Sequence, residues 1–290
     1  MSTVPGHRSR VLGRPPPAKG RTGSSGIGQL FAERRRRDVL YGASSYWDAR
    51  ASARSGMARS LWPSNTFNIL WDERQRALLA RALGDMSGRR VVDIGCGTGR
   101  VARWLAEDRG AHEVVGVDFS LSTVEAARRE SGALVSSGIV HFAQGDVLEG
   151  FDSLGAGGFD DAVVLGCLSV ACCDRASLCR AIGNVARLVR RGGRVLLLEP
   201  IHRSPLLRRV LDLGLEEWIA CANGAGLALL EADRMGFVPV RLVFSVRDLP
   251  RFLVAPLFAA GERALDRAAW LSPLSDYKML LFGKTTETAA

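Results

Sequence analysis

The chain has 290 residues, 47% of them apolar and 24% charged, so it can bury a full core and is not disordered throughout. Its net charge of +9 would suit a polyanionic partner, but residues 1–59 carry 12 of the 39 basic and three of the 30 acidic residues, which is the whole excess. The remainder holds 27 residues of each sign. The body is therefore neutral, and we expect no nucleic-acid partner.

The six cysteines and four histidines show no spacing typical of a zinc site, and no CxxC pair occurs. We therefore expect no metal and a reduced, cytoplasmic protein. The longest uncharged apolar stretches, 218–230 and 252–261, are shorter than the roughly 18–20 residues of a membrane span. The stretch 252–258 is compatible with peripheral membrane contact only.

Residues 1 to about 28 are rich in Pro, Gly, Ser and Arg with hardly an apolar residue, and we expect residues 1–40 to form a disordered basic arm. Residues 41–88 are expected to form a helical lid segment. Within it, Asn65 is a candidate N-cap for a helix over 66–83 that ends at Gly84.

From residue 89 onward, short apolar runs alternate with helical segments, which predicts a parallel sheet covered on both faces. The predicted strands are 90–94, 113–117, 139–142, 159–165 and 194–198. The predicted helices between them are 101–108, 122–131 and 174–190.

The C-terminal third follows a different pattern. It predicts a helical stretch over 206–235 and two further strands, 238–246 and 276–282, the second antiparallel at or near an edge of the sheet. The segment of about 249–269 is too long for a hairpin turn, which predicts an insertion that covers the top of the sheet.

The most informative motif is Asp93-x-Gly95-x-Gly97-x-Gly99, which lies directly after a predicted strand and before a helix. Glycines allow a tight turn and close approach of a ligand. Asp118 ends the next strand, where a carboxylate can accept hydrogen bonds from both hydroxyls of a ribose. The spacing differs from the GxGxxG loop of dinucleotide folds, and the leading carboxylate suits a ligand with a cationic end.

Residues 89–200 resemble class I S-adenosylmethionine-dependent methyltransferases. The resemblance rests on VVDIGCGTG at 91–99, VGVDFS at 115–120, QGDV at 144–147, FDD at 159–161 and LVRRGG at 188–193. It implies an α/β fold, a Rossmann-like doubly wound seven-stranded sheet with helical capping segments, in a methyltransferase domain spanning 89–290.

The resemblance also implies which residues bind S-adenosylmethionine. Asp93 is expected near the ammonium group of the cofactor, Asp118 at the ribose diol, Asp146 at the adenine amino group, and backbone at Gly166 or Cys167 near the methionine amino group. The full expected set is Asp93, Gly95, Cys96, Gly97, Gly99, Asp118, Phe119, Asp146, Val147, Gly166 and Cys167.

The acceptor side is less defined. The chain lacks the Asn/Asp-Pro-Pro-Tyr/Phe motif of enzymes that methylate base or amide nitrogens. His202, after the fifth strand, is the candidate general base, and a surface histidine is the alternative. Tyr46, Trp47 and Glu199 are candidate acceptor contacts; the two aromatic residues could equally serve ordinary packing.

These observations predict methyl transfer to a small, partly apolar metabolite, at a hydroxyl oxygen. Three alternatives remain open at the level of sequence. They are C-methylation of a quinone or polyketide precursor, methylation of RNA or protein with the basic arm as a tether, and cofactor binding without catalysis.

Overall fold

The structure is a computed structural model that describes residues 41–53, 57, 61–204 and 207–285. The predicted disordered arm at residues 1–40 lies outside this part of the chain. All elements discussed below belong to one compact unit that spans residues 37–290.

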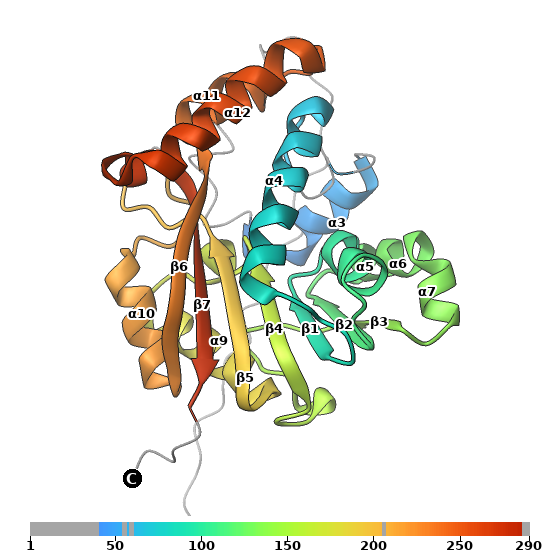
Figure 1. Ribbon diagram of the computed structural model, residues 1–290. Helices are drawn as coiled ribbons and strands as arrows, with labels where there is room; N and C mark the ends of the chain where they lie inside the picture. The colour runs from blue at the N-terminus through green and yellow to red at the C-terminus, as the bar shows by residue number, and fades with distance from the viewer. Residues whose placement is uncertain (1–40, 54–56, 58–60, 205–206, 286–290) are drawn as a thin grey trace, which may run out of the picture. The chain divides into compact units, whose positions relative to one another are not determined.

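The core is a seven-stranded sheet in the order β3-β2-β1-β4-β5-β7-β6 (Figure 1). Strands β1 to β5 pair in parallel, and β7 is antiparallel to both of its neighbours. The strands are β1 (Arg90–Ile94), β2 (Glu113–Asp118), β3 (Val140–Gln144), β4 (Phe159–Leu165), β5 (Val189–Glu199), β6 (Leu227–Phe237) and β7 (Ser275–Lys284). The predicted doubly wound sheet, with its antiparallel strand near one edge, is confirmed.

Both faces of the sheet are buried, because successive side chains of a strand point to opposite sides. In β1, Val91 belongs to one hydrophobic cluster and Val92 to the other. The first cluster is covered by α4 (Asn65–Leu83), α5 (Arg100–Glu107) and α6 (Leu121–Glu130). The second is covered by α8 (Leu168–Ala171), α9 (Arg175–Leu188) and α10 (Leu215–Gly224). The other helices in the described part of the chain are α3 (Ser44–Ala53), α7 (Gly132–Ser136), α11 (Val238–Phe244) and α12 (Arg251–Arg267), and 3₁₀ turns lie at Asp152–Leu154 and Ala269–Leu274.

The helix predicted over 66–83 is present as α4, with a different cap. Ser64, rather than Asn65, accepts a hydrogen bond from the Phe67 amide, and Gly84 ends the helix in a positive-φ conformation. The boundary was therefore misplaced by one residue.

The prediction for residues 206–246 is wrong in most of its length, whereas the strand predicted at 276–282 is present as β7. The helical stretch shrinks to α10, β6 occupies 227–237, and the predicted strand 238–246 is the helix α11. Pro239 lies in the first turn of α11, where its fixed φ suits a helix start. The leucine-rich run after Gly226 becomes a strand because β7 supplies a partner along its whole length.

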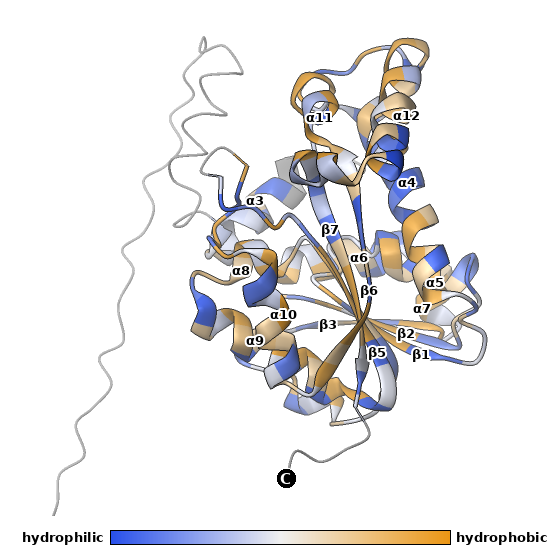
Figure 2. Cartoon of the chain, turned by 60° about the vertical axis from the view of Figure 1, so that its left-hand side comes forward, coloured by the Kyte–Doolittle hydropathy of each residue, from blue (hydrophilic) through white to orange (hydrophobic). Residues whose placement is uncertain are grey.

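An insertion, defined here as residues 238–274, separates β6 from β7 and contains α11, α12 and the 3₁₀ turn Ala269–Leu274. It extends beyond the sheet edge where the parallel strands end (Figures 1 and 2). The predicted 249–269 insertion is thus present and helical. It is fixed to the body: Arg74 on α4 pairs with Glu262 at 3.0 Å, and Gly261 lets α12 approach β6 closely. No helix within the described residues has the length and apolarity needed to cross a membrane.

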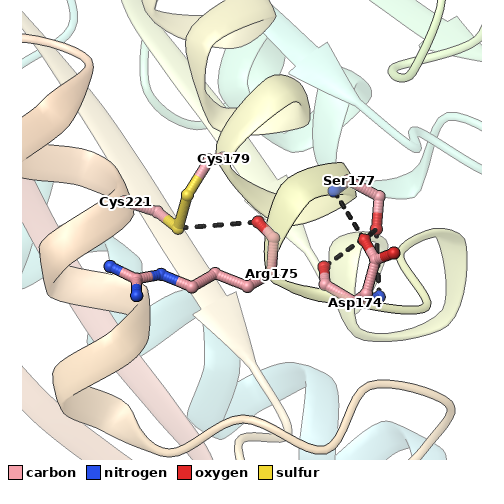
Figure 3. The surroundings of a disulfide bond; sticks show 5 residues. All are labelled: Asp174, Arg175, Ser177, Cys179 and Cys221. Carbon is pink, nitrogen blue, oxygen red and sulfur yellow. Dashed lines mark hydrogen bonds between the residues drawn. A yellow bond between two sulfur atoms is a disulfide. The ribbon is translucent and has the colours of Figure 1, made fainter.

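The expectation that the cysteines are unpaired is wrong at one place. Cys179 of α9 and Cys221 of α10 form a disulfide, with Cα atoms 4.7 Å apart (Figure 3). The two residues are 42 positions apart in sequence, and only the packing of α9 against α10 brings them together. A search for closely spaced cysteine pairs therefore had no signal for this bond.

Candidate active site

A cavity lies at the ends of β1, β2 and β4, where parallel strands place their connecting loops. Its described walls come from the glycine loop, the loops after β2, β3 and β4, the end of α8 and the N-terminal segment. The lining residues that carry polar or backbone recognition are Gly95, Gly97, Thr98, Asp118, Asp146 and Gly166.

The three loop glycines have different tasks. Gly95 and Gly97, at φ of 71° and 56°, line the cavity. A Cβ on Gly95 would come within 2.6 Å of the Cys167 Cβ, so a larger residue would push the two walls apart. Gly99 starts α5 and faces the Phe142 ring, at 2.6 Å for a Cβ, and is not among the lining residues. Gly99 thus packs against Phe142 and is not part of the described cavity wall.

Asp118, at the end of β2, is fixed by two backbone amides. Oδ2 accepts from Gly97 N at 3.0 Å, and Oδ1 accepts from Ser120 N at 3.0 Å. Burial raises the pKa of this carboxyl, while the amides of Ser120 and Gly97 oppose that shift. Each oxygen keeps a second lone pair for a ligand hydroxyl. The geometry suits the predicted contact with a vicinal diol.

Asp93 lies below the glycine loop with 2% of its surface exposed, outside the cavity lining. Its carboxylate accepts from the Ala102 amide in the first turn of α5, whose Gly99 cap offers no side chain. Oδ2 is buried without a hydrogen-bond partner among the described residues. Burial raises the pKa of Asp93 to about 7. An unsatisfied buried acceptor therefore lies behind the cavity lining, under the glycine loop.

The cavity's far wall follows β3 and β4. Asp146 and Val147 both line it, and Asp146 Oδ1 accepts from Leu148 N at 2.8 Å. Gly166 and Cys167, directly after β4, also line the cavity. Burial raises the pKa of the Cys167 thiol well above its usual value, so the thiol is neutral and not a nucleophile. Cys96 is buried between the strands and does not line the cavity, whereas Phe119 does.

The N-terminal segment contributes to the cavity lining, and of its two predicted aromatic contacts Trp47 is among the described lining residues and Tyr46 is not. Trp47 lines it together with Tyr41 and Gly42, and its Nε1 donates to Tyr41 O at 3.0 Å. Tyr46 stacks edge-on against Trp47 and does not line the cavity. Asp48 accepts a hydrogen bond from Ser120 Oγ at 2.5 Å, which ties α3 to the loop beside Asp118.

Glu199, predicted as an acceptor contact, is fully buried and lies behind the wall. Its carboxylate accepts from the amides of Cys167, Leu168 and Ser169 at 2.8, 2.9 and 3.2 Å. Burial raises its pKa to about 7. Glu199 therefore fixes the backbone that follows Gly166, and it is not among the described lining residues.

His202 is also buried and is absent from the described lining residues. Its Nε2 lies 2.8 Å from Asp276 O and 3.5 Å from Asp276 Oδ1, and Arg241 Nε lies 2.9 Å from Asp276 Oδ2. Burial acts to raise the pKa of Asp276, but Arg241, His202 and Arg209 together hold it below its usual value. His202 thus belongs to a buried polar cluster next to the site.

Tyr277, which the sequence did not single out, joins this cluster to the cavity. Its phenol oxygen would lie 3.1 Å from a Cβ at Gly166, and Arg209 hydrogen-bonds the same phenol. Tyr277 is on β7, far in sequence from every recognised motif, so no local signal could have found it. The same holds for Tyr41, whose neighbours in sequence carry no motif.

A family model described as a methyltransferase domain matches residues 91–193. The O-methyltransferase cnsE of Penicillium expansum is 29% identical over 153 residues, 51% of this chain and 52% of that protein. A ubiquinone biosynthesis O-methyltransferase of Alkalilimnicola ehrlichii is 33% identical over 174 residues, 60% of this chain and 62% of that protein. The chain thus spans about half to three fifths of the length of these relatives.

Among solved structures, phosphoethanolamine N-methyltransferase 2 of Haemonchus contortus, in complex with S-adenosyl-L-methionine, has a similar fold. The TM-score is 0.55 at 17% identity, covering 87% of this chain and 60% of that one. At this identity the likeness concerns the fold alone.

Proposed function

Because residues 91–193 form a class I S-adenosylmethionine-dependent methyltransferase domain, we propose that the protein methylates a hydroxyl oxygen of a small, partly apolar metabolite. The observation that carries the proposal is Asp118, whose carboxylate is held open toward the cavity by the Gly97 and Ser120 amides. O-methyltransferases among the relatives support the choice of oxygen.

The residues at the site fit S-adenosylmethionine. Asp118 would bind the ribose hydroxyls, and Asp146 with the Val147 amide would bind the adenine edge. The backbone at Gly166 and Cys167 would bind the methionine amino group. Asp93, behind the glycine loop, would add negative potential to the site in its ionised form. Of the other predicted contacts, Cys96 and Gly99 would act by shaping the loop.

When bound, the cofactor supplies an activated methyl group on a sulfonium centre, and the protein mainly has to align the acceptor with it. The lid residues Tyr41 and Trp47 and the α8 residues Val170 and Ala171 give the cavity aromatic and aliphatic walls. Such walls exclude water and favour an acceptor with an apolar body. A hydroxyl acceptor must lose a proton during transfer, so a base would accelerate the reaction.

We retain His202 as the proposed base. Its Nε2 donates to Asp276 O, which leaves Nδ1 as the nitrogen that can take up a proton. To act as the base, His202 Nδ1 must be reached by the acceptor hydroxyl or by an ordered water.

Titration calorimetry with S-adenosylmethionine tests the cofactor site. Asp118→Ala should weaken binding by roughly tenfold or more, because two hydrogen bonds to a charged acceptor are lost. Asp152→Ala, at an exposed aspartate outside the cavity, is the matched control and should bind as the wild type. Transfer of labelled methyl to phenols and hydroquinones, followed by mass spectrometry, tests the acceptor class. Absence of cofactor binding in the wild type overturns the proposal.

A further inference from the structure

The insertion exposes several large apolar side chains. Phe252 and Trp270 are 74% and 79% exposed. The others are Leu242, Val243, Val246, Leu253, Leu257 and Leu274. We propose that the insertion, through the exposed face of α12, binds the surface of a bilayer that contains anionic phospholipids.

On α12 the exposed side chains form one stripe. Phe252, Leu253 and Leu257 follow helical spacing, and the buried residues Val254, Phe258 and Leu265 occupy the opposite side. The buried side already has its partners: Phe258 contacts the Phe67 ring of α4 at 5.7 Å between centroids. The stripe therefore stays exposed after α12 has packed against the body, and packing within the domain does not explain it.

The same helix face becomes basic toward its end. Arg263 and Arg267 continue the stripe by helical spacing, are exposed, and form no ion pair or hydrogen bond to any residue that the structure describes. Helices that lie in the membrane interface combine apolar side chains that enter the acyl boundary with Lys or Arg side chains that reach the headgroups. Anionic headgroups are the complementary partner for these guanidinium groups.

The acidic side chains of the insertion do not oppose this charge, since each is held by the body. Asp248 accepts from Thr66 N at 2.8 Å at the start of α4. Asp266 pairs with Arg74 at 2.6 Å, and Glu262 is buried against the same arginine. The outward face therefore combines apolar and cationic groups, and the exposed Trp270 indole adds a residue suited to the headgroup level.

The insertion lies at the carboxyl edge of the parallel strands, since Glu199 at the end of β5 pairs with Lys278 shortly after the insertion ends. The cavity opens at this same edge. Bilayer contact there would hold the domain with its site toward a membrane. The inference does not depend on which acceptor is methylated.

Sedimentation of the full-length protein with vesicles tests the proposal. One set of vesicles is pure phosphatidylcholine, and the other contains equal parts of phosphatidylcholine and phosphatidylglycerol. The protein should bind the anionic vesicles only, and less at high salt because screening weakens the arginine contacts. Phe252→Glu should weaken binding by roughly tenfold or more. Arg263→Ala and Arg267→Ala should each lower the affinity for anionic vesicles about fivefold.

Two controls separate this face from general effects. Leu230→Glu adds a charge at a leucine that is 60% exposed on β6, and Arg129→Ala removes an exposed arginine on α6. Both should bind vesicles as the wild type. All of these variants keep residues 1–40, so binding through the basic arm would be unaffected by Phe252→Glu.

Equal binding by wild type and Phe252→Glu overturns the proposal, as does equal binding to neutral and anionic vesicles. Light scattering that finds a dimer which Phe252→Glu dissociates, without vesicle binding by either protein, would instead assign the face to a second copy of the chain. Cofactor titration on the same variants keeps the two proposals apart, because loss of vesicle binding should leave cofactor affinity unchanged.

Discussion

The phenol oxygen of Tyr277 lies so close to Gly166 that a Cβ on the glycine would be 3.1 Å from it. Gly166 is also at a positive φ of 63°. The last strand of the sheet thereby sets the position of the loop after β4, which is the wall of the cavity that we assign to the methionine end of the cofactor.

Gly166→Ala should destabilise the protein by about 1–2 kcal/mol from backbone strain alone. The close contact of the new Cβ with the Tyr277 oxygen should add to this destabilisation. Tyr277→Phe removes the crowded oxygen, so the double variant should lose less cofactor affinity than the sum of the single variants. A double-mutant cycle measured by calorimetry checks this. Strict additivity would contradict a direct contact between the two positions.

Asp93→Asn should change how stability depends on pH. Burial raises the pKa of Asp93 to about 7 from the usual 3.8, so between these values the folded protein holds a proton that the unfolded chain has lost. The stabilisation that comes from the protonated Asp93 side chain is therefore fully present at low pH and is lost as the pH rises toward 7. Ionisation of Asp93 thus lowers the free energy of unfolding by at most about 4 kcal/mol, and Asp93→Asn abolishes this pH-dependent loss.

Urea unfolding of wild type and Asp93→Asn at pH 4 and pH 7.5, without added cofactor, measures the effect. The variant should gain stability relative to the wild type at the higher pH. Asp152→Asn, at an exposed position, should show a constant difference from the wild type. A constant difference for Asp93→Asn as well would refute the burial argument.

The motif from Asp93 to Gly99 and Asp118 could be predicted because its meaning is local: a tight turn after a strand, and a carboxylate at the next strand end. Tyr277 and Tyr41 could not, since only the sheet order and the docking of the N-terminal segment bring them to the cavity. The leucine run of β6 was misread for a similar reason. Its local preference is helical, and its pairing with β7 overrides that preference.

Glu199→Gln should weaken cofactor binding without touching the cofactor. The carboxylate oxygens accept three amides, whereas the amide side chain would place an NH₂ group against at least one of them. We expect a loss of about 1–3 kcal/mol in stability and a matching rise in the dissociation constant of S-adenosylmethionine. Unchanged affinity for S-adenosylmethionine, measured by calorimetry on the folded variant, would show that the cavity wall after β4 does not depend on Glu199.

Removal of the Cys179–Cys221 disulfide should destabilise the domain. The bond closes a loop of 42 residues, for which the chain-entropy model gives about 4 kcal/mol. Cys179→Ser with Cys221→Ser should unfold at lower urea concentration than the oxidised wild type, and reduction of the wild type should reproduce most of the shift. Cys173→Ser, at an exposed free thiol, is the control. Identical midpoints for oxidised and reduced wild type would argue that the bond does not form.

His202 can act as a base or only hold the cluster around Asp276, and two substitutions distinguish these roles. His202→Gln can keep a donor near the position of Nε2 but cannot accept a proton, whereas His202→Ala loses both functions. We expect His202→Ala to lose about 1–3 kcal/mol of stability and His202→Gln to recover part of it. If His202 is the base, kcat should fall by roughly a hundredfold or more in both variants, with cofactor affinity retained. Recovery of kcat in His202→Gln would assign the residue to positioning, because the glutamine restores the hydrogen bond to Asp276 but not the proton transfer.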